Sequence, residues 1–302
     1  MTPRSDRGGI VFVTIGVGLF STSAVLVRLA VPHSAFEITF GRMVVAAAFV
    51  AVIAVATGVR LDFRAGEIGR FALYGLITAA HFLLYIWSLD YTTIAHSLAL
   101  VYTAPIFVTI FAAVLLRESF PLRALSGIPI VLIGIAILTG LEARLDPRML
   151  VGDAMAIGSA VCLGLYSVAG RRERTRQPLL RYATGVYGAA ALWLIPTAAL
   201  SLTGWHGLGP ALSIVAMGIF PLGIGHTLYN ASLRRVHPTL VNLVATQEVT
   251  GGVILGALIL GEMPSPSSAI GAVLTIAGVA LVLLTAPRRT EGESRTERGR
   301  TP

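Results

Sequence analysis

A carboxylate stands inside an apolar stretch of this sequence, in the segment VATQEVTGG at residues 244–252. An ionised carboxylate at the centre of a bilayer costs at least about 2.5 kcal/mol on insertion scales, so Glu248 requires an explanation. Glu248 lines a wet cavity and attracts an ammonium group, or it exchanges protons during a transport cycle, or it is a neutral or paired structural group. No arginine in the apolar stretches is an obvious partner, which favours the wet cavity.

The neighbours of Glu248 limit how this segment is built. On a straight helix Thr246, Gln247 and Glu248 spread over about 200°, so the three side chains cannot share one narrow face. Either the helix is distorted here, which Gly251 and Gly252 permit, or one of the three side chains faces a neighbouring helix. We predict that Gln247 and Glu248 contribute to a binding site.

Histidine, tyrosine and other polar residues recur at helical spacing in two distant apolar stretches. The two groups are His81, Tyr85 and Ser88, and His226, Tyr229 and Asn230. Residues three, four or seven apart share a helix face, and polar groups in hydrocarbon need partners, so each group is expected to face a bundle interior. There the side chains line a cavity and offer hydrogen bonds and stacking, or they serve interhelical packing. For the second group, shared ancestry without a retained role is a further explanation.

Tyr102 lies one turn before Pro105 in another apolar stretch. Proline removes one helical hydrogen bond, and the freed carbonyl groups are tolerated in a membrane only where other groups satisfy them. We therefore expect a kink at Pro105 that lines a cavity, with Tyr102 as an aromatic contact. A purely structural bend is the alternative.

Glu37 and Arg42 stand near the start of a further apolar stretch, five residues apart. At that spacing they do not face each other squarely on a regular helix, although both can reach the headgroup region or a bundle partner. The pattern fits an ion pair with a gating or structural role, and it also fits a solvated helix start.

The sequence lacks the motifs of enzymes and cofactor-binding proteins. It contains no His/Cys metal cluster, no glycine-rich phosphate loop, and no nucleophile with a base at a recognisable spacing. The single cysteine, Cys162, precludes a disulfide within the chain. We therefore expect no catalytic residue, no metal and no cofactor.

Composition indicates that membrane helices hold these residues. Of 302 residues, 55% are apolar and 13% charged, with a mean hydropathy of +0.80, whereas soluble domains have about 25% charged residues. Apolar windows long enough to cross about 30 Å of hydrocarbon recur along the chain and do not alternate as barrel strands do. The predicted fold is an all-α integral membrane protein with ten transmembrane helices. They lie at 10–31, 35–57, 69–89, 94–116, 124–141, 151–169, 180–202, 209–232, 239–260 and 267–286.

Basic residues are concentrated in alternate loops. All 23 are arginines; we assign 19 to the N-terminus, alternate loops and the tail, and only Arg144 and Arg148 to the opposite loops. The positive-inside rule then places both termini in the cytoplasm. The net charge of +8 is thus a topology signal, and we expect no nucleic-acid partner. Residues 1–9 form a cytoplasmic N-terminus, and the polar tail at 287–302 is expected to be disordered.

The chain also contains an internal repeat. At a shift of 144 residues, YIWSL at 85–89 falls on YNASL at 229–233. A slightly different shift pairs GLFS at 18–21 with GLYS at 164–167. Each half contains five spans, an odd number, so the second half is threaded upside down. Inverted five-helix repeats of this kind are the building units of alternating-access transporters.

Residues 100–138 and 243–283 both follow one pattern: a helix, a run rich in small residues, Leu-x-Glu, and a second helix with glycines seven apart. This pattern resembles the ending of an EamA domain, in which the first of the two helices bears a proline. The resemblance covers residues 10 to 286 and implies membership of the drug/metabolite transporter superfamily, with one repeat at 10–141 and another at 151–286. Ten-helix amino-acid exporters, including the YddG type, look like the nearest relatives.

The second half departs from the family pattern at one place. It has Val249 where the first half has Pro105. A symmetric pair of broken helices is therefore not implied for the ninth span.

We predict a bacterial inner-membrane exporter that moves a small zwitterionic or aromatic metabolite outward by alternating access, with an amino acid as the expected substrate. The predicted site consists of His81, Tyr85, Tyr102, His226, Tyr229, Asn230, Gln247 and Glu248. Its aromatic rings would stack on the substrate, and Glu248 would attract the substrate's ammonium group. An exporter of cationic drugs or other metabolites, a passive channel and a membrane enzyme are the alternatives. Protons are a candidate second partner, and the chain is a monomer or a homodimer.

Overall fold

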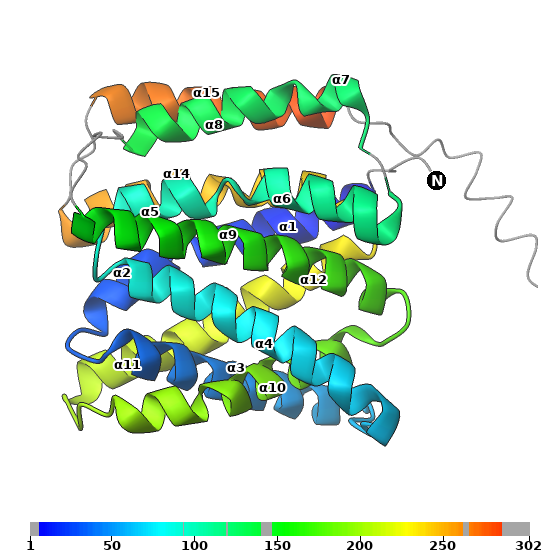
Figure 1. The fold of residues 1–302 in the computed structure, drawn as a ribbon, viewed down its shortest axis with the longest axis vertical. Helices are drawn as coiled ribbons and strands as arrows, with labels where there is room; N and C mark the ends of the chain where they lie inside the picture. Colours follow the sequence, from blue (N-terminus) through cyan, green and yellow to red (C-terminus); the bar gives the residue numbers. More distant parts are fainter. Residues whose placement is uncertain (1–5, 93, 119, 140–146, 262–265, 286–302) are drawn as a thin grey trace, which may run out of the picture.

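A computed structural model of the chain describes residues 6–92, 94–118, 120–139, 147–261 and 266–285. Every regular element within these ranges is helical, and the helices lie side by side across the molecule (Figure 1). The predicted disordered tail and most of the predicted N-terminal segment lie outside the described residues. The first half contains α1 (Arg7–Phe20), α2 (Ser23–Leu29), α3 (Ala35–Ala56), α4 (Ala65–Ser88), α5 (Ile94–Val101), α6 (Ala104–Phe111), the π-helix η1 (Ala112–Leu116), α7 (Leu122–Leu125) and α8 (Gly127–Thr139). The second half contains α9 (Pro147–Arg174), α10 (Leu179–Leu200), α11 (Leu208–Met217), the π-helix η2 (Gly218–His226), α12 (Thr227–Leu233), α13 (Pro238–Ala245), α14 (Gln247–Leu255), the π-helix η3 (Gly256–Leu260) and α15 (Pro266–Thr285).

Eight helical segments in the described ranges are long and apolar enough to cross a membrane. They are Arg7–Leu29, Ala35–Ala56, Ala65–Ser88, Ser97–Leu116, Pro147–Arg174, Leu179–Leu200, Leu208–Leu233 and Pro238–Leu260. Two shorter apolar helices, Gly127–Ile137 and Ala269–Val282, occupy the places of the fifth and tenth predicted spans. The all-α membrane fold is therefore confirmed for the part of the chain that the structure describes.

The sixth span is longer than hydropathy predicts, because α9 continues from residue 169 to Arg174. Arg171 accounts for part of this extension: its Nη1 donates to the Leu233 carbonyl oxygen at 2.8 Å, and its Nε lies 3.2 Å from the Glu118 carboxylate. Hydropathy ends a span at the first charged residues, whereas a helix continues wherever those residues find partners.

The fourth and ninth spans are interrupted at equivalent positions. α5 ends at Val101, and α13 ends at Ala245, 144 positions later. A distorted helix near Glu248 was one of the two possibilities left open by the sequence, and the structure has it at Thr246. In the ninth span the Thr246 hydroxyl donates to the Leu243 carbonyl oxygen at 2.7 Å.

The same shift of 144 relates the ends of these two spans. η1 at Ala112–Leu116 corresponds to η3 at Gly256–Leu260. Each is followed by a residue with left-handed backbone, Arg117 at φ 56° and Gly261 at φ 72°. The sequence repeat is thus also a repeat of backbone geometry.

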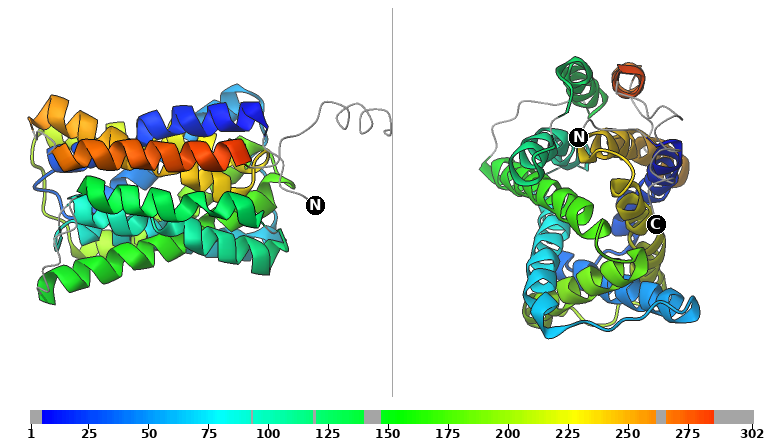
Figure 2. Two further views of the ribbon diagram at one scale, coloured as in Figure 1. Left: turned by 90° about the horizontal axis from the view of Figure 1, so that it is seen from above. Right: turned by 90° about the vertical axis from the view of Figure 1, so that its right-hand side faces the viewer.

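The glycines spaced seven apart bring α8 and α15 into close contact. A Cβ on Gly127 would lie 2.2 Å from the Val282 side chain, and one on Gly134 would lie 2.6 Å from the Thr275 backbone nitrogen. Figure 1 shows the two helices running in opposite directions, and Figure 2 shows them side by side at one edge of the bundle. In this chain the glycines therefore serve packing within the bundle.

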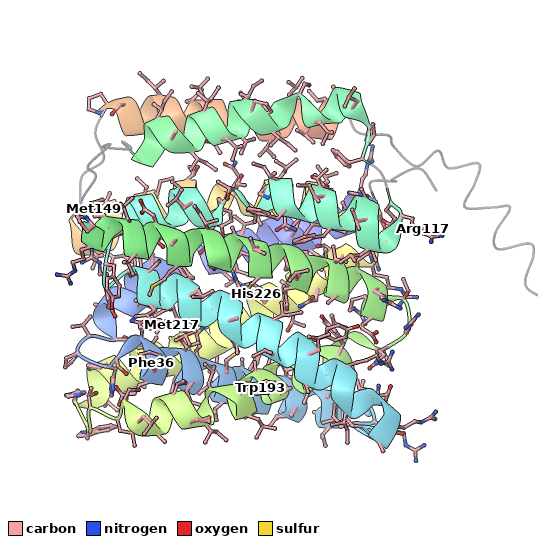
Figure 3. All side chains as sticks on the ribbon, viewed as in Figure 1. Phe36, Arg117, Met149, Trp193, Met217 and His226 are labelled. Atoms are coloured by element: carbon pink, nitrogen blue, oxygen red, sulfur yellow. The ribbon has the colours of Figure 1, made fainter. Side chains whose placement is uncertain are left out.

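The two halves pack against each other throughout the remaining bundle. α1 contacts η2 and α12, α4 contacts α9 and α10, and α6 contacts α9 and α13. Figure 3 places His226 among the central helices, between Arg117 at one end of the bundle and Met149 at the other. A site around His226 therefore lies between the two repeats and far from both ends.

Candidate substrate site

An internal cavity of about 30 Å³ lies between the two halves. Six of the eight predicted binding residues border it: His81, Tyr85, Tyr102, His226, Tyr229 and Glu248. The remaining lining residues are Phe20, Ser23, Arg42, Phe82, Leu98, Val101, Leu163, Pro221 and Ala245. Small-molecule pockets measure about 300–1,000 Å³, so the walls must separate before a metabolite fits.

Tyr102 and Glu248 meet on the wall of this cavity, at the two interrupted spans. The Tyr102 hydroxyl donates a hydrogen bond to Glu248 Oε2, and both residues are buried. Glu248 is the second residue of α14, and Thr246 alone separates α14 from the end of α13. The carboxylate therefore lies beside the interruption of the ninth span.

Arg42 also borders the cavity, although it forms no ion pair with Glu248 within the described residues. It is 1% exposed, and its electrostatic field acts on Glu248. Its guanidinium carbon lies 4.5 Å from the centre of the Phe82 ring. Its Nε and Nη1 atoms are buried and have no hydrogen-bond partner among the described residues. Arg42 is therefore a charged wall of the cavity.

Glu37 lies apart from the cavity and forms no ion pair with Arg42 in the described structure. Its carboxylate accepts bonds from the Thr203 backbone N–H at 2.9 Å and the Thr203 hydroxyl at 2.6 Å. It also forms a capping box with Ser34 at the start of α3. With 9% exposure it is not the solvated residue that a helix start suggests. It ties α3 to the α10–α11 connection.

His81 is held in place by α9. Its Nδ1 lies 3.0 Å from the Ser159 carbonyl oxygen, and the Ser159 hydroxyl donates to the His81 carbonyl oxygen at 2.8 Å. The Ser159 hydroxyl oxygen also lies 2.9 Å from His81 Nδ1. On the same face of α4, the Tyr85 hydroxyl is buried without a partner. The predicted His81–Tyr85 face therefore meets both the cavity and the other half of the chain.

Tyr229 and Asn230 have different surroundings. The Tyr229 hydroxyl lies 2.5 Å from Ser167 Oγ and accepts a bond from Asn242 Nδ2 at 2.7 Å. Asn230 does not border the cavity. Its Nδ2 donates to the Tyr166 hydroxyl at 2.5 Å and to the His226 carbonyl oxygen at 2.8 Å. Asn230 thus holds the helix that carries His226 and Tyr229.

Gln247 and Pro105 do not border the cavity either. Gln247 contacts Thr246 and Thr250, both at 3.5 Å. Pro105 stands in the first turn of α6, just after the interruption at Tyr102 and Thr103. Proline is favoured at this position because its missing N–H has no helical partner there. Pro105 therefore starts a second helical segment, and Tyr102 before it reaches the cavity.

The sequence interpretation missed several lining residues, although one signal was available for Phe20. Its ring lies 4.3 Å from that of His226. Phe20 belongs to the GLFS segment that repeats as GLYS, and Tyr166, its counterpart in the repeat, lies 5.9 Å from the same His226 ring. The repeated aromatic residues thus flank His226 from two sides. For Phe82 and Leu163, apolar residues among many others, no signal in the sequence was available.

Comparison with known families decides the class of protein. The profile of the EamA-like transporter family matches residues 7–140 and 150–284. The chain belongs to this family. The predicted resemblance is thereby confirmed, two EamA repeats are present, and the protein is a membrane transporter, not an enzyme.

Relatives of this EamA-family protein include named exporters. It is 27% identical over 266 residues to a "Probable terminal-alkyne amino-acid exporter" of Streptantibioticus cattleyicolor, covering 85% of this chain and 86% of that protein. It is 27% identical over 190 residues to the "Aromatic amino acid exporter YddG" of Ancylobacter novellus, covering 62% and 66%. A solved crystal structure shares the fold, with a TM-score of 0.81 and 23% identity over 93% of this chain and 98% of that one.

Proposed function

We propose that this EamA-family protein exports amino acids across a bacterial inner membrane by alternating access. The observation that carries the proposal is the buried Glu248 carboxylate on the wall of an aromatic cavity between the two repeats. A carboxylate in this position attracts an ammonium group. The rings of Tyr85, Tyr102 and His226 offer faces on which the substrate's apolar part stacks.

Two further observations support the substrate class and the direction. Relatives of this chain carry names that describe export of aromatic amino acids and of a terminal-alkyne amino acid. The arginine-rich loops lie at the same end of the bundle as the beginning of α1 and the end of α15, which we assign to the cytoplasm (Figure 1). Outward transport then runs from this arginine-rich end to the opposite end.

The interrupted helices supply the moving parts of the proposed mechanism. Tyr102 and Glu248 hold the first and second halves together at the cavity. When a substrate ammonium group reaches Glu248, it competes with the Tyr102 hydroxyl for the carboxylate. The segments on either side of each interruption then separate toward one end of the bundle at a time, which is alternating access. Asn230 acts as a positioning residue for His226, and Gln247 contributes through the conformation of α14.

Export of cationic drugs is the second candidate, because a buried carboxylate among aromatic rings also suits a permanent cation. The two candidates predict different ligands. An amino-acid exporter exchanges phenylalanine and ignores tetraphenylphosphonium, whereas a cation exporter does the reverse.

Counterflow in proteoliposomes tests the proposed function. Vesicles preloaded with unlabelled phenylalanine, without a proton gradient, should accumulate labelled phenylalanine transiently. Empty vesicles and vesicles preloaded with tetraphenylphosphonium serve as controls. If vesicles that contain folded protein accumulate no labelled phenylalanine but exchange the permanent cation, the protein is an exporter of cationic drugs and not of amino acids. Accumulation would also show that exchange needs no proton gradient.

A further inference from the structure

Arg42 is a buried cation with unused hydrogen-bond donors. It is 1% exposed on α3, and no ion pair joins it to a carboxylate in the part of the chain that the structure describes. Its Nε and Nη1 atoms are buried and have no hydrogen-bond partner. A buried charge is normally paired, and a buried donor left unsatisfied costs about 1–3 kcal/mol or more when charged. The fold therefore keeps this arginine at a cost that packing alone does not explain.

The unused donors of Arg42 lie at a place that can receive a ligand. Arg42 borders the central cavity together with Tyr85, whose hydroxyl is also buried without a partner. The Phe82 ring, 4.5 Å from the guanidinium carbon, covers one side of the group. A guanidinium only donates hydrogen bonds, so what completes it must be an acceptor.

The nearby acceptor on the cavity wall does not complete Arg42. Glu248 acts on Arg42 electrostatically, but its carboxylate accepts a hydrogen bond from Tyr102 and lies outside ion-pair distance of the guanidinium. The cavity wall therefore carries a cation with free donors, Arg42, and a separate anion, Glu248. A planar guanidinium matches the two oxygens of a carboxylate in a forked pair, and this pairing is stronger than a neutral hydrogen bond.

We propose that Arg42 binds the carboxylate of the transported molecule, with the Tyr85 hydroxyl as an additional donor. This inference rests on the proposed function and specifies its substrate class: molecules that carry a free carboxylate, with the ammonium group directed to Glu248. Amines, amides and esters of the same side chain lack the group that Arg42 needs. Arg42 is thereby a specificity-determining residue that separates amino acids from cationic amines.

Competition in counterflow tests the carboxylate requirement in the unaltered protein. Uptake of labelled phenylalanine is measured with increasing concentrations of one unlabelled competitor at a time. The competitors are phenylalanine, phenethylamine, which lacks the carboxylate, and 3-phenylpropionate, which lacks the ammonium group. Phenethylamine should compete at least about tenfold more weakly than phenylalanine, because it forms no charged pair with Arg42. Equal competition by phenethylamine would overturn the inference.

Variants then assign the requirement to Arg42. Arg42→Gln should raise the phenylalanine concentration needed to halve uptake at least about tenfold. In this variant the half-inhibiting concentrations of phenylalanine and phenethylamine should lie within about threefold of each other. Arg42→Lys should keep part of the preference, because it keeps the charge but not the planar fork. Arg28→Gln, a change at an exposed arginine, is the matched control and should keep the full ratio. If Arg42 had only a structural role, Arg42→Gln would lower the uptake of every substrate and leave the ratio between phenylalanine and phenethylamine unchanged. That result would also overturn the inference.

Ligand-dependent thermal stability separates this inference from the proposed function. If no amino acid is exchanged but 3-phenylpropionate stabilises the parent protein and not Arg42→Gln, amino-acid export fails and the carboxylate site stands. If amines are exchanged and no carboxylate binds, amino-acid export and the carboxylate site at Arg42 are both refuted. If inorganic phosphate stabilises through Arg42 and carboxylates do not, the carboxylate assignment is overturned. A lack of response to every carboxylate probe has the same meaning.

Discussion

The Tyr102 hydroxyl donates a hydrogen bond to the Glu248 carboxylate where the interrupted spans of the two halves meet. Tyr102 belongs to the first repeat and Glu248 to the second, so this bond links the two repeats beside the cavity. Tyr102 follows the end of α5 at Val101, and Glu248 is the second residue of α14. The bond therefore joins the fourth and ninth spans next to their interruptions.

Removing the Tyr102 hydroxyl should destabilise the protein, whereas removing the Tyr85 hydroxyl should not. Tyr102→Phe leaves the buried Glu248 carboxylate without its donor, with an expected cost of about 1–3 kcal/mol. Tyr85→Phe deletes a buried hydroxyl that has no partner, so its effect should be within about 0.5 kcal/mol or slightly stabilising. The two changes are chemically identical and are compared by the midpoint of thermal unfolding in detergent. Equal effects would contradict the role of the Tyr102–Glu248 bond.

The α8–α15 contact allows a second matched comparison. A methyl group at Gly134 would lie 2.6 Å from the Thr275 backbone nitrogen, so Gly134→Ala should separate the helices and destabilise by about 1–3 kcal/mol. Gly188 in α10 has no atom of another element within 4 Å of an added Cβ. Gly188→Ala should therefore be neutral or stabilise by up to about 1 kcal/mol through helix propensity. The midpoints of thermal unfolding of the two variants are compared with that of the parent protein. A Gly188→Ala variant as destabilised as Gly134→Ala would refute the packing argument.

Much of the fold could be predicted from the sequence, because each membrane span must be about 20 residues long and mostly apolar to cross the hydrocarbon core of a bilayer. Hydropathy located the helices, and the repeat at 144 residues indicated two related halves. A distortion near Glu248 was one of two possibilities that the sequence left open, and the structure interrupts the ninth span at Thr246. Residue types did not fix that position, because no proline marks it as Pro105 marks the fourth span.

The candidate site could be predicted only in part, because residue type does not fix the direction of a side chain. Histidine and tyrosine inside apolar spans were correctly expected to face the interior at His81 and His226. Arg42 looked like a residue near a helix end, yet it lies seven residues after the first residue of α3, about 10 Å along the helix. That depth brings it to the cavity. Gln247 does not line the central cavity, although its neighbour Glu248 does.

Acid should destabilise the protein through His237, which lies in the connection between α12 and α13. Its Nδ1 accepts a bond from the Thr239 N–H at 3.2 Å and caps α13. Burial lowers the pKa of His237 from 6.5 to about 4. The unfolded chain therefore binds the proton first as pH falls, and stability is constant above pH 6.5 and is lost between about 6.5 and 4. The loss at pH 5 should be about 2 kcal/mol.

The variant His237→Asn tests this contribution, because asparagine also caps a helix but does not titrate. Thermal unfolding is compared at pH 7.5 and pH 5 in the parent protein and the variant. The parent should lose more stability than the variant over this interval. Identical losses would show that other groups cause the acid sensitivity.

Replacing Glu248 by glutamine should distinguish the possible roles of its carboxylate. Glutamine keeps the shape and still accepts a bond from Tyr102, but it has no charge to attract an ammonium group and no proton to exchange. If Glu248 binds substrate, Glu248→Gln should reduce counterflow of phenylalanine at least about tenfold with normal membrane insertion and thermal stability. If Glu248 serves only to carry protons, counterflow without a gradient should persist and only uptake driven by a proton gradient should disappear. Unchanged transport in both assays would remove Glu248 from the mechanism and leave it a structural acceptor for Tyr102.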